Sequence, residues 1–296
     1  MYRYLAYGRA TDPVSAQDFN QLLLAIAAKP DGFGVAVEML SARLHSDKDR
    51  QQDQAPEIVD AGCELMRRLT FARKSDREDY DLSVISRACL VRERGAAIAK
   101  DLCRRLKNSN SKYEIYAPLY NDLLEGLFSV QPRAALDGLF SGDAAERELG
   151  VRLVDDIRGL RKNPLDVVPE GELLDWCDQE PRTRYSVAAA VITVSHHIEE
   201  TGPRLWTNIA LRLLEKAPDR VEVLKEFARQ FTPISWSNSR ATIIELNAKL
   251  LNELERYPDP TVVEFIAQEK VRLGHMIEAE RRTEMEMSRE RHERFE

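Results

Sequence analysis

The chain has 296 residues, 43% hydrophobic and 31% charged, which is the balance of a globular protein with a charged surface and not of a disordered chain. Its net charge of −7 argues against general nucleic-acid coating, and no run of residues is apolar enough to span a membrane. The N-terminus lacks the apolar core of a signal peptide. The four cysteines have neither metal-binding nor redox spacing, so we expect buried free thiols in a cytoplasmic protein.

The N-terminal half of the chain has the pattern of successive short amphipathic helices. Ser15 or Asp12 can cap the first helix, and Pro30 lies in the Pro-Asp-Gly run that ends it. Pro56 suits the first turn of a later helix. Further on, the run from Ser141 to Asp143 can end one helix and cap the next. Because helical periodicity dominates and strand patterns are almost absent, the sequence predicts an all-α protein.

The polar run Asn108–Ser111 is the clearest break in the helical pattern. We expect it to separate an N-terminal helical sub-array, residues 1–110, from a helical-repeat array, residues 111–277. Residues 278–296 are mostly Glu and Arg, and opposite charges three or four positions apart support a solvated helix. The sequence therefore predicts a long C-terminal helix with a charged tail.

An internal repeat is most evident in the C-terminal half. Two segments open alike, with Pro203 and Trp206 in one and Pro233 and Trp236 in the other, and both are expected to begin helices. The β-prone run 191–194 follows several alanines, so helix is favoured there as well. Three leucine pairs, at 173–174, 213–214 and 250–251, each precede a proline, and the prolines Pro181, Pro218 and Pro258 are 37 and 40 residues apart.

This spacing and the Pro-Asp breaks resemble the HEAT and armadillo families of helix-pair repeats. The resemblance implies a right-handed α-solenoid of about six or seven antiparallel helix pairs with degenerate repeats. The chain also resembles helical C-terminal regions of large bacterial proteins, including phage-defence proteins, where such arrays serve as sensors or scaffolds. HEAT-like DNA glycosylases are a further precedent, but their binding surface is basic and no catalytic residue carries over.

No motif for catalysis, cofactor binding or metal binding is present. The chain has no phosphate-binding glycine loop, no nucleophile elbow and no HExxH motif. His196 and His197 are adjacent, so on a helix they would point about 100° apart, and a polar helix end is the favoured interpretation. We therefore expect no cofactor, no metal and no catalytic residue, although an enzyme with a site in a groove stays a third alternative.

Two sets of residues are candidate binding surfaces. Trp206 and Trp236 could line a groove, although packing between repeats is the favoured interpretation. Residues 61–112 hold 13 basic and 7 acidic side chains, and connections in a solenoid can align into one basic strip. The candidate residues of that strip are Arg67, Arg68, Arg73, Lys74, Arg104, Arg105 and Lys107.

The sequence favours a non-catalytic scaffold or sensor module that recognises a protein partner. The N-terminus lacks a polar capping helix, so packing against an N-terminal extension of a larger protein is also expected. The alternative is a nucleic-acid-binding repeat protein that uses the basic strip. No membrane partner is expected.

Overall fold

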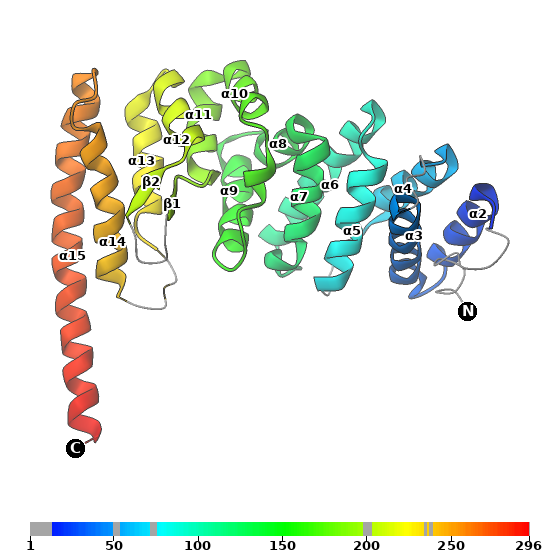
Figure 1. The fold of residues 1–296 in the computed structure, drawn as a ribbon, viewed down its shortest axis with the longest axis horizontal. Helices are drawn as coiled ribbons and strands as arrows, with labels where there is room; N and C mark the ends of the chain where they lie inside the picture. The colour runs from blue at the N-terminus through cyan, green and yellow to red at the C-terminus, as the bar shows by residue number, and fades with distance from the viewer. Residues whose placement is uncertain are drawn as a thin grey trace. The chain divides into compact units, whose positions relative to one another are not determined.

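The computed structural model describes residues 14–49, 54–71, 76–197, 203–233, 236 and 239–295 (Figure 1). Fourteen α-helices, three 3-10 helices and one two-stranded hairpin form the regular structure of this part of the chain. The elements are α2 (Ala16–Ala27), α3 (Gly32–Asp49), α4 (Pro56–Arg68), α5 (Asp76–Cys89), α6 (Glu93–Ser111), η1 (Ala117–Tyr120), α7 (Asn121–Val130), α8 (Pro132–Phe140), α9 (Ala144–Arg158), η2 (Pro164–Val167), α10 (Glu170–Gln179), α11 (Pro181–Val191), β1 (Ser195–His197), β2 (Arg204–Trp206), α12 (Asn208–Lys216), α13 (Arg220–Gln230), α14 (Arg240–Ala248), η3 (Lys249–Leu254) and α15 (Pro260–Phe295).

Several helices begin where the sequence offers a cap or a proline. The side chains of Ser15, Asp143 and Asp219 accept hydrogen bonds from backbone amides in the first turns of α2, α9 and α13. Pro56 occupies the first turn of α4, where a missing N–H costs nothing. The prediction of an all-α fold is confirmed in its coarse form, since the described residues are predominantly helical.

The chain forms two compact units, residues 1–176 and residues 177–296. The expected division near Asn108–Ser111 stays a prediction. Those four residues do not form a linker, however, because they are the last turn of α6. That helix ends in a Schellman pattern, with the N–H groups of Tyr113 and Glu114 bonded to the carbonyls of Asn110 and Ser109.

In the first unit, helices α2 to α6 each pack against the next helix but one, and several of them also pack against the next helix. The next-but-one series contains the pairs α2–α4, α3–α5, α4–α6, α5–α7 and α6–α8. Figure 1 shows α3, α5 and α7 side by side. Side-chain hydrogen bonds follow the same spacing, since Gln131 donates to the Leu90 carbonyl and Trp176 donates to the Asp137 carboxylate. These bonds join residues 41 and 39 positions apart, close to the spacing of the prolines in the sequence.

The second unit repeats this spacing. Helix α13 packs against α11 and α15, and Gln230 donates to the Ala189 carbonyl, 41 positions earlier. Arg220 and Asp259 form an ion pair of 3.2 Å across 39 positions. All the leucines that marked the repeat in the sequence are buried, at 173–174, 213–214 and 250–251. The leucine pairs therefore lie at core positions.

A short hairpin corrects two expectations. Residues Arg204–Trp206 form strand β2 and not a helix start, and they pair antiparallel with β1, Ser195–His197. His196 thus lies in a strand and not at a polar helix end. Helix α11 stops at Val191, because Ile192 adopts an extended conformation and Val194 is buried just ahead of β1. The β-branched residues near 191–194 favoured extended backbone more than the preceding alanines favoured helix.

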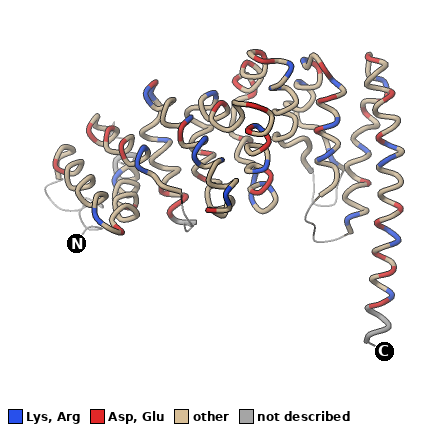
Figure 2. Tube along the Cα trace, turned by 180° about the vertical axis from the view of Figure 1, so that it is seen from behind, with Lys and Arg blue, Asp and Glu red and all other residues tan. Residues whose placement is uncertain are grey.

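Helix α15 is the long C-terminal helix that the sequence predicts. Its 36 residues span about 54 Å at 1.5 Å per residue. Glu284 fixes it to α14 by accepting hydrogen bonds from the Ser239 hydroxyl and the Ala241 amide. Past that point Met285 and Met287 are exposed, and Figure 2 shows basic and acidic residues interspersed along the helix.

None of the described helices is both long enough and apolar enough to cross a membrane.

Candidate functional site

The structure places five of the seven basic-strip residues and leaves Arg73 and Lys74 outside the described residues. Arg67 and Arg68, in the last turn of α4, both pair with Glu64, at 3.5 and 2.7 Å. Charge on this part of the strip is therefore partly neutralised within one helix, as opposite charges at helical spacing favour.

The remaining strip residues, on α6, are either paired with an acidic side chain or buried. Arg104 and Arg105 pair with Asp101, at 2.6 and 2.7 Å. Burial raises the pKa of the Asp101 carboxyl, but the two guanidinium groups lower it by more, so the net shift is downward. Arg105 also donates to the Leu69 carbonyl beyond the end of α4 and so acts as a structural cap. Lys107 is only 3% exposed, and burial lowers its pKa. The nucleic-acid interpretation stays a prediction, and these contacts weaken it.

The two tryptophans that open alike in sequence have different environments. Trp206 is buried, with ring centroids 5.7 Å from Phe227 and 6.0 Å from Phe231, and its indole N–H donates to the Leu250 carbonyl. Trp236 is 48% exposed, and the Arg240 guanidinium lies 4.7 Å from its ring centroid. Trp206 is therefore packed within its own unit, against residues that follow it in the chain and not against a preceding repeat, whereas Trp236 is about half exposed. Whether either ring lines a binding groove stays a prediction.

Groups that could hold a metal ion are absent from the described part of the chain, and Cys63 lies close enough to Cys89 to donate to its backbone carbonyl at 3.4 Å. No group of three or more His, Cys, Asp and Glu side chains is placed there to hold an ion. All four cysteines are free and buried. Burial raises the pKa of Cys89 and of Cys177 to about 12, so the reactive thiolate is disfavoured at both positions.

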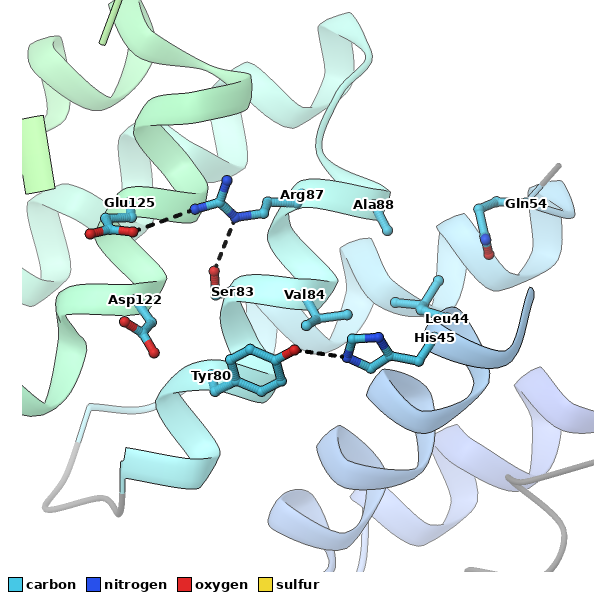
Figure 3. Close-up of a pocket in the computed structure, with 10 residues that line it drawn as sticks. All are labelled: Leu44, His45, Gln54, Tyr80, Ser83, Val84, Arg87, Ala88, Asp122 and Glu125. Carbon is cyan, nitrogen blue, oxygen red and sulfur yellow. Dashed lines mark hydrogen bonds and ion pairs between the residues drawn. The ribbon is translucent and has the colours of Figure 1, made fainter. Parts of the chain in front are cut away.

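A groove of about 610 Å³ lies in the first unit, and the sequence did not predict it (Figure 3). Three helices of one series, α3, α5 and α7, supply most of its walls. We call it the α3–α5–α7 groove. Its lining residues are Leu44, His45, Gln54, Tyr80, Ser83, Val84, Arg87, Ala88, Asp122 and Glu125.

Helix α5 forms the centre of the groove because five of its residues share one face. Tyr80, Ser83, Val84, Arg87 and Ala88 are separated by three or four positions, which places them along one side of a helix. The same face alternates apolar and polar side chains. A groove with an apolar floor and polar groups along its edges is typical of sites that bind ligands or peptide segments.

Two contacts fix α7 beside α5. The Asp79 carboxylate, buried in α5, accepts hydrogen bonds from the backbone amides of Asp122 and Leu123 at 2.8 and 2.9 Å. It thus caps the first turn of α7 from a neighbouring helix. Farther along, Gly126 lets the helices approach closely, since a Cβ there would lie 2.1 Å from the Ser86 hydroxyl oxygen. These contacts place Asp122 and Glu125 at the groove wall.

Polar side chains meet across the groove at two places (Figure 3). At one, the rings of His45 and Tyr80 are stacked at 5.8 Å, with the Tyr80 hydroxyl 3.3 Å from His45 Nε2. At the other, the Arg87 guanidinium donates to the Ser83 hydroxyl at 3.2 Å and lies 3.7 Å from the Glu125 carboxylate. Both contacts join neighbouring helices or turns, so the polar edge is ordered before any ligand binds.

No known family model, curated protein or solved structure matches this chain. The site is therefore defined by its own geometry.

Proposed function

We propose that the protein is a non-catalytic recognition scaffold of the HEAT-like type, and that the α3–α5–α7 groove receives a segment of a protein partner. The observation that carries the proposal is the groove itself, about 610 Å³, crossing successive helices of one packed series. In helical-repeat proteins such series form extended surfaces that bind other chains.

The packing pattern of the helices supports this choice. Next-but-one packing and hydrogen bonds across about 40 positions are the contacts that stacked helix pairs make. The right hand of the solenoid and the antiparallel orientation of its pairs are part of the proposal. So is a cytoplasmic, bacterial setting for a sensor or scaffold, in which the four buried thiols remain free.

A protein partner fits the surface better than nucleic acid does. Phosphate binding requires cations that are free to neutralise the backbone, whereas Arg105 and Lys107 are engaged in packing and Arg104 pairs with Asp101. A test of nucleic-acid binding should therefore reverse the charge of Arg67, Arg68 and Arg104, which spares the fold. Salt-sensitive binding to duplex DNA that is lost in this variant would favour the alternative.

The experiment for the proposed function blocks the groove without removing a buried side chain. Val84 is half-buried in the groove floor, so Val84→Arg fills it, and Val271→Arg on the exposed face of α15 is the matched control. We expect a partner captured from native lysate by the wild type and by the control to be absent from Val84→Arg. Capture by all three proteins alike would refute the groove as the recognition site.

A further inference from the structure

Two acceptor groups among the lining residues of the groove lack a donor within the described part of the chain. The Asp122 carboxylate makes no hydrogen bond or ion pair with the described side chains, and it lies one turn from Glu125 on α7. At the opposite end, Gln54 Oε1 is buried and has no donor among the described residues. Gln54 Oε1 is closed off from the groove, whereas the Asp122 side chain is only half-buried, so an occupant that donates hydrogen bonds suits the Asp122 end.

The side chains that line the groove carry a net negative charge. Arg87 and Glu125 offset one another at 3.7 Å, and Asp122 leaves one negative charge beside them. Apolar walls strengthen the attraction of such a charge for a cation, because the local dielectric is lower than that of water. Tyr80, half exposed, adds an aromatic face against which a cation can lie.

The floor of the groove favours an occupant that also carries an apolar side chain. Leu44, Val84 and Ala88 give the groove an apolar strip next to the acceptor wall. Covering this strip with an aliphatic or aromatic side chain would remove apolar surface from water. A small inorganic cation would leave it exposed, whereas a peptide can cover the strip and reach the wall at the same time.

We propose that the groove binds an extended segment of a partner protein in which a lysine or arginine side chain reaches Asp122 and Glu125 and a neighbouring apolar side chain covers Val84. The inference rests on the proposed function and names the chemistry of its partner. An acidic segment fits less well, because Arg87 already donates to Ser83 and pairs with Glu125 while Asp122 would repel a further carboxylate.

The test selects a phage-displayed random peptide library on the full-length wild-type chain. Selected peptides are then measured against Asp122→Asn, which keeps the shape of the side chain and removes its charge, and against Val84→Arg. Glu148→Gln, at an exposed position of α9 whose carboxylate is paired with Arg152, is the matched control for removal of a negative charge from the same unit.

We expect enrichment of peptides with a basic residue next to an apolar one. Their affinity should fall about tenfold in Asp122→Asn, decrease with added salt and stay unchanged in Glu148→Gln. One outcome would overturn this inference and leave groove recognition intact. In it, the selected peptides are acidic or uncharged, lose affinity for Val84→Arg and bind Asp122→Asn as tightly as the wild type. Enriched peptides that bind Val84→Arg as tightly as the wild type would overturn both.

Discussion

Gly138 lies at the crossing of α8 and α6, where a methyl group has no room. A Cβ built there would be 2.4 Å from the Lys100 backbone oxygen and 2.7 Å from Cys103 Cβ, whereas ordinary contacts begin at 3.4 Å. Because a backbone oxygen cannot rotate away, Gly138→Ala must push the two helices apart by up to about 1 Å, the difference between an ordinary contact and the present separation.

The expected loss of stability follows from two opposing effects. Overpacking costs about 1–3 kcal/mol, and a rigid obstacle puts this site near the upper end. Alanine stabilises a helix interior by about 1 kcal/mol relative to glycine, which offsets part of this cost. The net destabilisation of Gly138→Ala is therefore about 2 kcal/mol, which lowers the melting temperature of a unit of this size by about 4–8 °C.

Gly171 provides the control within the same unit. It lies in the first turn of α10, and a Cβ there would meet nothing within 4 Å. Gly171→Ala should be neutral or stabilising by up to about 1 kcal/mol. Urea denaturation and calorimetry of the two variants measure the difference. A Gly138→Ala protein as stable as Gly171→Ala would refute the close approach of α6 and α8.

Three further outcomes test other contacts. Asp79→Ala should cost about 2–3 kcal/mol in urea denaturation, because it removes the cap of α7 and leaves buried amides unpaired; an unchanged midpoint would contradict its anchoring role. At about pH 8 the native thiols should resist a thiol reagent and react once urea unfolds the chain, since burial raises the pKa of Cys89 to about 12; prompt native modification would contradict this. Burial raises the pKa of Glu284, but hydrogen bonds led by the Ser239 hydroxyl lower it by more, so the net shift is downward. Its stabilising effect is therefore present above the unfolded pKa of about 4.3 and is lost as pH falls through the lower folded value. The protection factors of amides in the first turn of α14, which correct the exchange rate for its intrinsic pH dependence, should accordingly fall on acidification in the wild type. Glu284→Gln should remove that pH dependence of the protection factors.

Local signals in the sequence predicted the helices well, because caps and prolines act within a single turn. Ser15, Asp143 and Pro56 each start a helix through groups a few residues away. The leucine pairs marked only a spacing in the sequence, and the structure adds that all of them are buried. Lys107 could also have been placed, because it follows Cys103 by four positions on the buried face of α6.

The groove could not be found in this way. Its lining depends on how α5 lies against α7, and that register is set by Asp79 contacting amides 43 and 44 positions later. Nothing near Asp79 in the sequence marks it as a cap for a distant helix. Trp236 was misplaced for a related reason, since similarity to the Trp206 segment carried no information about the aromatic side chains Phe227 and Phe231, which enclose Trp206 alone.

The hydrogen bonds between helices about 40 positions apart have a consequence for folding kinetics. Each one forms after closure of a loop no longer than a helix pair, and the entropy of closing a loop grows only slowly with its length. Because these contacts join elements that neighbour one another along the chain and not the two ends of a unit, folding can begin at several places within it. The ends of a unit can then open while its middle stays folded, so slow hydrogen exchange should be concentrated in its central helices.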